Sequence, residues 1–202
     1  MGMHRPPPAL TDVQVRVKAL ASVLAEKGMV QQETLDAIVE EYETKIGPHC
    51  GAQVVARAWS DPAFKKLLLD DGSAAIDAMG FGGFEGAHMA VRENTPAIHN
   101  MVVCTLCSCY PRMLLGLPPD WYKSQAYRRR AVREPRAVLA EFGTPVPENV
   151  TIRVHDSTAD MRYMVLPMRP AGTGGWSEEQ LFELLNRDCL VGTTLPGSRR
   201  LG

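Results

Sequence analysis

The sequence lacks any apolar run that approaches the ~20 residues of a membrane-spanning helix. Its first residues, MGMHRPPP, lack the apolar core of a secretion signal. An excess of one charge is also missing, because 22 basic and 23 acidic residues leave a formal net charge of −1. This balance excludes a whole-chain attraction to nucleic acid or to an anionic membrane. We therefore expect a cytoplasmic protein that binds neither nucleic acid nor membrane.

Cysteine is scarce, with five residues in 202, and three of the five are crowded into one stretch. Such a distribution is a poor disulfide framework and suits a reducing compartment, where thiolates remain available for metal. The other two, Cys50 and Cys189, are isolated in the sequence. We expect them to be plain buried thiols.

The crowded stretch is C-T-L-C-S-C, from Cys104 to Cys109. Three thiols in one tight segment cannot all be buried as core residues, since neighbouring side chains point in different directions. They predict a metal-binding claw. A structural zinc site normally adds a second ligand pair from a distant stretch, and the sequence offers none. Thiolates select late transition metals and exclude calcium and magnesium.

The Cys-Ser-Cys step at 107–109 adds a second chemical feature. It places the backbone nitrogens of Ser108 and Cys109 between two sulfurs that would hold the metal. Five-membered chelate rings could form there if the two amides lost their protons. Only a strongly Lewis-acidic centre would achieve that.

The motif and its surroundings resemble the α subunit of nitrile hydratase, of the cobalt type. The resemblance covers nearly all of the chain except about the first ten residues. Its matching stretches are 54–59, 93–96, 103–111, 116–119, 121–123, 133–136 and 162–167.

The resemblance implies a non-corrin Co(III) centre, with Fe(III) as the less favoured metal, because cobalt-type members carry Thr and iron-type members Ser at the position of Thr105. The implied ligands are the sulfurs of Cys104, Cys107 and Cys109 and the amide nitrogens of Ser108 and Cys109. One position stays open for chemistry.

In this family the residues matching Cys107 and Cys109 are oxidised to sulfinic and sulfenic acid. The resemblance implies that two arginines of a β subunit hold these oxygens, and that a separate activator or metallochaperone inserts the metal in some systems. The implied reaction adds water to a nitrile and gives an amide. Cys109, as nucleophile or base, and Ser108 are the expected catalytic residues.

Three residues near the claw depart from the pattern expected for the family. Glu85 stands where several relatives have Gln, and Arg112 where many have Trp. Both are candidates for the substrate pocket, although either side chain could equally turn to solvent. Asp160 replaces a frequent Glu. The histidines have no partner at ligand spacing, so we expect ordinary structural histidines.

Periodicity and caps predict an α+β fold: a helical arm, then a layered domain of helices and a sheet that carries the claw loop. Residues 1–50 are expected to form a flexible tail and the arm, which packs on a partner subunit, and residues 51–202 the catalytic domain. Helices are predicted at 11–28, 33–46, 52–59, 62–69, 73–79, 124–134, 136–142 and 177–186. Strands are predicted at 89–92, 98–103, 150–154 and 163–166, the last two as neighbours across a turn at 155–158, and a loop is predicted at 114–119.

Two other functions compete with nitrile hydration. The metal-bearing subunit of thiocyanate hydrolase resembles this chain in the claw and acts on a related triple bond. A non-catalytic zinc or redox module would instead contain unoxidised cysteines, with Cys104 and Cys107 cycling as a dithiol. A cluster of arginines at 128–136 is predicted to be a solvated or ion-paired face, in preference to a nucleic-acid site.

Overall fold

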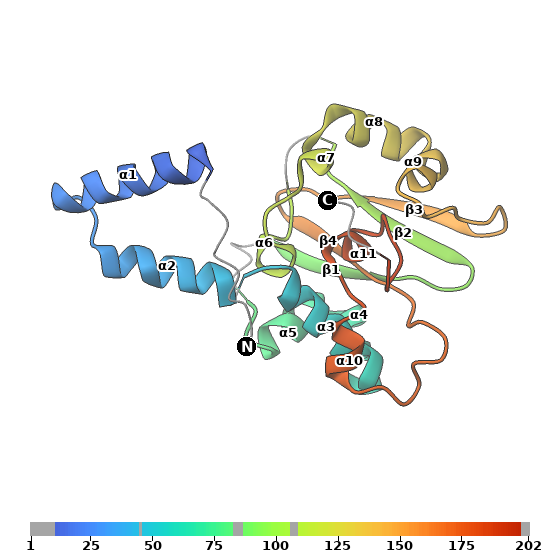
Figure 1. The fold of residues 1–202 in the computed structure, drawn as a ribbon. Helices are drawn as coiled ribbons and strands as arrows, with labels where there is room; N and C mark the ends of the chain where they lie inside the picture. Colours follow the sequence, from blue (N-terminus) through green and yellow to red (C-terminus); the bar gives the residue numbers. More distant parts are fainter. Residues whose placement is uncertain (1–10, 45, 83–86, 106–108, 199–202) are drawn as a thin grey trace, which may run out of the picture. The chain divides into compact units, whose positions relative to one another are not determined.

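The structure is a computed structural model, and it describes residues 11–44, 46–82, 87–105 and 109–198. The chain divides into two compact units, Met1–Glu43 and Thr44–Gly202 (Figure 1). The cysteine motif belongs to the second unit.

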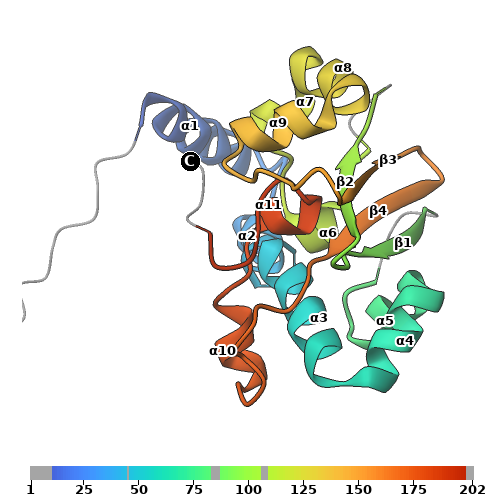
Figure 2. The same cartoon turned by 90° about the vertical axis from the view of Figure 1, so that its right-hand side faces the viewer.

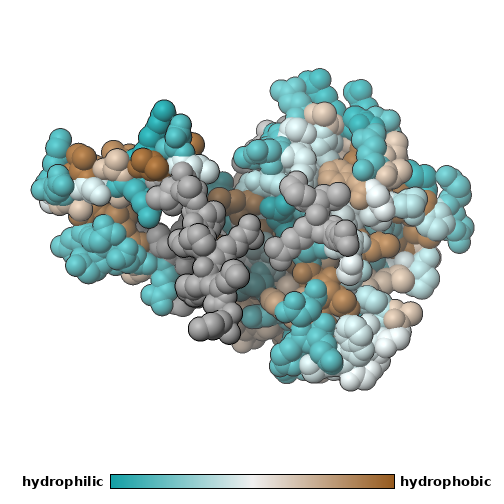
Figure 3. Space-filling model, viewed as in Figure 1, coloured by the Kyte–Doolittle hydropathy of each residue, from teal (hydrophilic) through white to brown (hydrophobic). Residues whose placement is uncertain are grey.

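The first unit consists of two helices, α1 (Asp12–Glu26) and α2 (Gln32–Thr44), the second of which ends at the unit boundary. Gly28 follows α1 in a left-handed conformation, with φ of 65°, as expected for the predicted stop. Apolar side chains of α1 stay exposed, with 69% of Val13 and 60% of Leu20 accessible. They are visible as brown residues along this helix in Figure 3. The first unit therefore has an apolar helix face without a cover of its own.

The helices of the second unit begin where the sequence supplies caps. In α4 the Asp61 carboxylate accepts hydrogen bonds from Ala63 N and Phe64 N, and Pro62 occupies the first turn, as predicted. The capping box of Ser177 and Gln180 is also confirmed. The helices are α3 (Pro48–Ser60), α4 (Pro62–Asp70), α5 (Gly72–Ala78), α6 (Arg112–Leu115), α7 (Asp120–Lys123), α8 (Gln125–Arg133), α9 (Pro135–Glu141), α10 (Glu178–Phe182) and α11 (Arg187–Val191).

Two of these boundaries differ from the prediction. The helix predicted to reach Asn186 ends at Phe182, and Asn186 instead caps a separate helix, α11, through a second capping box. The stretch predicted as a loop at 114–119 begins with the end of α6. Short apolar turns between prolines leave little periodicity, so the sequence alone did not reveal them.

The four strands form two parallel pairs. β1 (His88–Glu93) pairs with β4 (Met161–Leu166), and β2 (Ile98–Val103) pairs with β3 (Thr151–Asp156). The predicted pairing of the last two strands across a turn is therefore wrong. Parallel pairing needs long crossovers, and the chain supplies them through α6–α9. This topology places residues about fifty positions apart side by side in the β2–β3 pair, and residues more than seventy positions apart in the β1–β4 pair.

The strands lie between two groups of helices. In Figures 1 and 2, α8 and α9 lie on one side of the strands, and α3, α4 and α5 lie on the other. β2 is buried almost throughout, and the core around it includes Val55, Leu68, Met101 and Met164, none of which exposes any surface. The α+β prediction is thus confirmed. No helix in the described ranges is long and apolar enough to cross a membrane.

Candidate metal centre

The cysteine motif begins at the end of the most buried strand. β2 ends at Val103, and Cys104 follows with no exposed surface. The strand is fixed from behind, because the Tyr127 hydroxyl donates a hydrogen bond of 2.7 Å to the carbonyl of Val102. The first thiol of the motif therefore leaves a rigid scaffold, which confirms the predicted position of the motif after a strand.

A carboxylate on the neighbouring strand holds the next residue. Asp156 is the last residue of β3 and pairs with Val103. Its Oδ1 accepts a hydrogen bond of 2.9 Å from Thr105 N, and its Oδ2 one of 2.5 Å from Thr105 Oγ1. Both oxygens of Asp156 are thus used to fix one residue of the motif. This role could not be predicted from the sequence, because it depends on the parallel pairing of β2 with β3.

This contact bears on the position proposed to separate cobalt-type from iron-type chains. A serine hydroxyl could donate to Asp156 in the same way as the hydroxyl of Thr105. The hydrogen bond by itself therefore does not distinguish the two residues. What threonine adds is its methyl group, which restricts the χ1 angle of the side chain.

The chain leaves the motif through a second set of anchors. Cys109 is half-buried, and its carbonyl accepts a hydrogen bond of 3.3 Å from the Tyr122 hydroxyl. The carbonyl of Tyr110 accepts one of 3.2 Å from Arg162 Nη1. The rings of Tyr110 and Tyr122 meet edge to face, with centroids 4.8 Å apart. Both ends of the motif are therefore held by residues from other elements.

The phenols of Tyr110 and Tyr122, behind the motif, keep their protons and are not bases. Burial raises the pKa of Tyr122 and of Tyr110 above the ordinary value for a phenol. Nearby acidic groups, with Cys104 first among them, raise the pKa of Tyr122 further. Tyr122 therefore keeps its proton and can serve the Cys109 carbonyl at any physiological pH.

Arg162 brings a further donor to the same place. Its Nε is buried and has no hydrogen-bond partner within the described residues, while its Nη1 bonds Tyr110. A buried guanidinium N–H without a partner is costly, and an anionic neighbour would relieve the cost. The surroundings of the motif thus suit a thiolate or an oxidised sulfur.

The centre of the motif lies outside the described residues, and this includes Cys107 and Ser108. Within the described ranges, no three His, Cys, Asp or Glu side chains come together in a way that could hold a metal ion. Of the predicted sulfur ligands, the structure describes Cys104 and Cys109. The full ligand set remains a prediction.

The predicted pocket residues are only partly placed. Glu85 lies outside the described ranges, and Arg112 is exposed at the start of α6. Asp160 is also exposed, and its carbonyl accepts a hydrogen bond of 2.7 Å from His88 N. Whether any of the three contacts substrate stays a prediction.

His99 and Cys189 have ordinary structural roles. His99 Nε2 lies 2.8 Å from the carbonyl of Gly192, and burial lowers the pKa of His99. The Cys189 thiol donates to the carbonyl of Asn186, and burial raises its pKa to about 12. A thiol with such a pKa stays protonated, as expected for a structural cysteine.

The arginine cluster forms ion pairs at its centre, as predicted. Arg130 donates to Glu134 and, through two nitrogens, to Glu141. Arg136 donates to backbone carbonyls, among them that of Val146. The guanidinium groups of Arg130 and Arg136 therefore form their ion pairs and hydrogen bonds within the chain.

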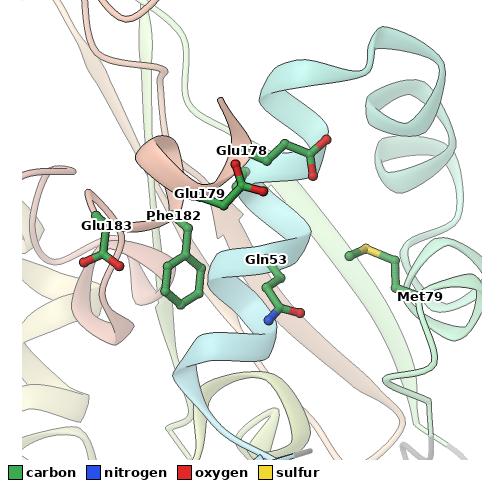
Figure 4. A pocket seen from close by; sticks show the side chains of 7 residues that line it. Gln53, Met79, Glu178, Glu179, Phe182 and Glu183 are labelled. Carbon is green, nitrogen blue, oxygen red and sulfur yellow. The ribbon is translucent and has the colours of Figure 1, made fainter. Parts of the chain in front are cut away.

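A cavity of about 420 Å³ lies elsewhere, between α3, α10 and the end of α5. Figure 4 shows Glu178 and Glu179 of α10, and Glu183 just after it, around Phe182, with Gln53 of α3 opposite. No cysteine of the described ranges lines this cavity. It is therefore not the predicted centre.

Comparison with known proteins gives a consistent result. Residues 11–194 match the family model described as nitrile hydratase, alpha chain. The chain is 52% identical to the low-molecular weight cobalt-containing nitrile hydratase subunit alpha of Rhodococcus rhodochrous, over 97% of each chain. It is 43% identical to the thiocyanate hydrolase subunit gamma of Thiobacillus thioparus, over 93% of this chain and 81% of the relative. Among solved structures, a double mutant of the Fe-type nitrile hydratase from Comamonas testosteroni Ni1 superimposes with a TM-score of 0.79, at 46% identity, over 91% of this chain and 90% of the other.

Proposed function

Because the chain belongs to the nitrile hydratase alpha-chain family, we propose that it is the metal-bearing subunit of a cobalt nitrile hydratase. The observation that carries the proposal is the pair of hydrogen bonds that Thr105, inside the C-T-L-C-S-C motif, donates to the Asp156 carboxylate. A metal claw with two backbone ligands needs its loop held in one conformation, and this contact together with the Tyr122 anchor supplies such a hold.

The proposed ligands are the sulfurs of Cys104, Cys107 and Cys109 and the backbone nitrogens of Ser108 and Cys109. Soft sulfur donors with amide nitrogens suit cobalt or iron, and the similarity to a cobalt-containing relative favours cobalt. The buried position of Cys104 and the unpartnered N–H of Arg162 support this assignment. Cys107 as sulfinate and Cys109 as sulfenate would spread negative charge over oxygens that accept hydrogen bonds.

The reaction proposed is the hydration of a nitrile to an amide. When bound, trivalent cobalt would supply the Lewis acidity that makes the nitrile carbon electrophilic. Cys109, as sulfenate, would act on the nitrile carbon as a nucleophile, or as a base that takes a proton from water. One water is consumed, and both its hydrogens end on the amide nitrogen. With Cys109 as base, the water oxygen becomes the carbonyl oxygen. With Cys109 as nucleophile, the sulfenate oxygen becomes the carbonyl oxygen and the water oxygen restores the sulfenate. Ser108 would orient this centre through its backbone nitrogen.

The proposed active form is a complex with a β subunit, which is consistent with relatives that are named as alpha subunits. Arginines of that subunit would hold the oxidised sulfurs. The helical arm, within residues 1–50, would cover its exposed apolar face on the partner, because exposed residues such as Val13 and Val17 gain from burial. A separate activator would insert the metal.

Metal analysis of the chain co-expressed with its β subunit tests the proposal. We expect about one cobalt per chain, and peptide mass spectrometry over the motif should find two added oxygens on Cys107 and one on Cys109. Replacing Cys107 with Ala should abolish both cobalt binding and nitrile turnover. The matched control is Cys189→Ala, which removes a thiol from α11 and should keep the cobalt.

Assays with acrylonitrile and with thiocyanate separate the two catalytic alternatives. The expected result is turnover of acrylonitrile to acrylamide, whereas turnover of thiocyanate alone would identify a thiocyanate hydrolase. Zinc with unmodified cysteines in the co-expressed complex would contradict both, and would indicate a zinc or redox module.

A further inference from the structure

A second cavity, also of about 420 Å³, opens between α4, β1 and the β2–β3 pair. We call it the arginine trough. Its lining includes Arg92 of β1, Arg153 and His155 of β3, and Asn100 of β2. Asn100 pairs with Arg153, three residues before the pair of Val103 and Asp156. At ~3.3 Å per residue Arg153 lies about 10 Å along the strand from Asp156, whereas His155 directly precedes Asp156. None of the lining residues belongs to the cysteine motif, so the trough is a different feature of the same scaffold.

The positive charges in the trough are not neutralised by the fold. Neither Arg92 nor Arg153 has a carboxylate within 4.0 Å in the parts of the chain that the structure describes, although Arg92 lies over the ring of Tyr163, 5.5 Å from its centroid. The one acidic residue of the lining, Glu93, forms an ion pair with Lys65. The trough therefore carries two guanidinium groups that are available to an anion.

Hydrogen bonds determine which nitrogen of His155 carries a proton. Asn100 Nδ2 donates to the carbonyl of Glu93 at 2.7 Å and to Asn94 Oδ1 at 3.0 Å, so that Asn100 Oδ1 faces His155. His155 Nε2 lies 2.9 Å from that oxygen and must donate to it. The other nitrogen, Nδ1, is then the one that gains a proton when the ring becomes cationic.

The environment of His155 favours its neutral form as long as no anion is bound. Burial lowers the pKa of His155, and the positive charges of Arg92 and Arg153 lower it further. The ring of Tyr163 stacks on it at 5.1 Å without adding charge, and the charge of Glu93 is taken up by Lys65. A bound anion would offset the repulsion from both arginines, so binding should raise this pKa.

Apolar side chains complete the lining. Leu69 of α4 and Ile98 of β2, both partly exposed, contribute carbon surface beside the cationic groups. Guanidinium groups bind the two oxygens of a carboxylate in a planar, bidentate manner. A ligand with a carboxylate and a short hydrocarbon chain satisfies both parts of this lining, whereas inorganic phosphate would leave the apolar part without a partner.

From these contacts we propose that the arginine trough binds a small organic carboxylate, with its oxygens on Arg92 and Arg153 and its hydrocarbon chain against Leu69 and Ile98. This site does not depend on the metal centre. It adds to the chain a ligand class that differs from the uncharged nitrile and amide of the proposed reaction.

Calorimetric titration of the co-expressed complex with pentanoate tests the proposal. Arg92→Gln and Arg153→Gln should each weaken binding about tenfold or more, as expected for the loss of one charge-assisted pair. The matched control is Arg129→Gln, which removes an exposed arginine from α8 and should leave the affinity unchanged. Circular dichroism of each variant verifies that the fold is intact.

Two further titrations sharpen the result. Pentanamide, which has the same shape without the charge, should not compete for the trough, and inorganic phosphate should bind more weakly than pentanoate. In the wild-type complex the affinity for pentanoate should rise as the pH falls, because His155 gains a proton, and His155→Gln should remove this dependence. Absence of binding, equal binding in all three arginine variants, or tighter binding of phosphate would each overturn the proposal.

Discussion

The β2–β3 pair carries two polar regions whose groups are used in opposite ways. At its end, both oxygens of Asp156 are hydrogen-bonded to Thr105. Three residues earlier, Arg153 has no acidic partner in the described ranges, and its neighbour Arg92 has none either. In the first region the carboxylate oxygens form their hydrogen bonds within the chain and hold the cysteine motif. In the second region the guanidinium groups can bind a ligand. A strand pair can thus hold one site rigid and leave another available.

The largest effect is expected from a change in the buried core of β2, the strand that both regions share. Met101 is fully buried in β2, and Met101→Ala should lower the free energy of unfolding by about 2–5 kcal/mol through lost contacts and a cavity. Urea denaturation measures this. Leu67→Ala, which truncates a side chain 41% exposed on α4, is the control and should change stability by less than about 0.5 kcal/mol. Equal effects of the two would contradict the central position of β2.

The next change acts at the end of the strand pair, where Asp156 holds the cysteine motif. Asp156→Ala removes both hydrogen bonds to Thr105, and we expect metal content or activity to fall about 10- to 100-fold, as for other groups that orient metal ligands. Metal analysis and nitrile turnover of the complex measure it. Asp70→Ala, at an exposed position of α4, should leave both unchanged. Full activity in Asp156→Ala would show that the contact does not position the motif.

A smaller effect is expected at the other anchor of the motif. Tyr122→Phe removes the donor to the Cys109 carbonyl, which is a long hydrogen bond of 3.3 Å. Stability should fall by about 0.5–1.5 kcal/mol, and turnover should fall less than in Asp156→Ala. Because burial raises the pKa of this phenol, the activity difference between wild type and Tyr122→Phe should not vary between pH 6 and 9. A variation there would indicate that Tyr122 titrates.

The smallest expected effect is a pH dependence of stability that arises from His155 in the arginine trough. When no carboxylate ligand is bound, burial and the charges of Arg92 and Arg153 lower the pKa of His155 from its ordinary value of 6.5. As the pH falls below that value, the unfolded chain takes up a proton that the folded chain does not, so stability should decrease. His155→Gln should reduce this decrease, as denaturation at pH 7 and pH 5 would show. His99 is also buried with a lowered pKa, so part of the decrease should persist in the variant.

Several elements could be predicted from local sequence because their causes are local. Asp61 with Pro62 begins α4, and Ser177 with Gln180 begins α10, each through contacts within four residues. The stop at Gly28 is local as well. The cysteine motif stood out because its spacing restricts the chemistry that three thiols can perform. These inferences needed no knowledge of what lies beside each segment.

The pairing of strands could not be read in this way. The last two strands are close in sequence and were predicted to be neighbours, yet each pairs with an earlier strand. Long-range parallel pairing is decided by how helices cover the strands, and it leaves no short-range signal. The same reason explains why Asp156 was missed, since its partner Thr105 lies 51 residues away.

Residue identity alone accounts for the chemistry of the molecule: three thiols in C-T-L-C-S-C, a balanced charge, and amphipathic helices with their caps. Which distant groups meet that chemistry follows from the fold. It brought Asp156, Tyr122 and Arg162 to the motif, and it placed Arg92 beside Arg153 and His155. The physical reason is that ligand type is a property of single residues, whereas orientation and uncompensated charge depend on which strands lie side by side.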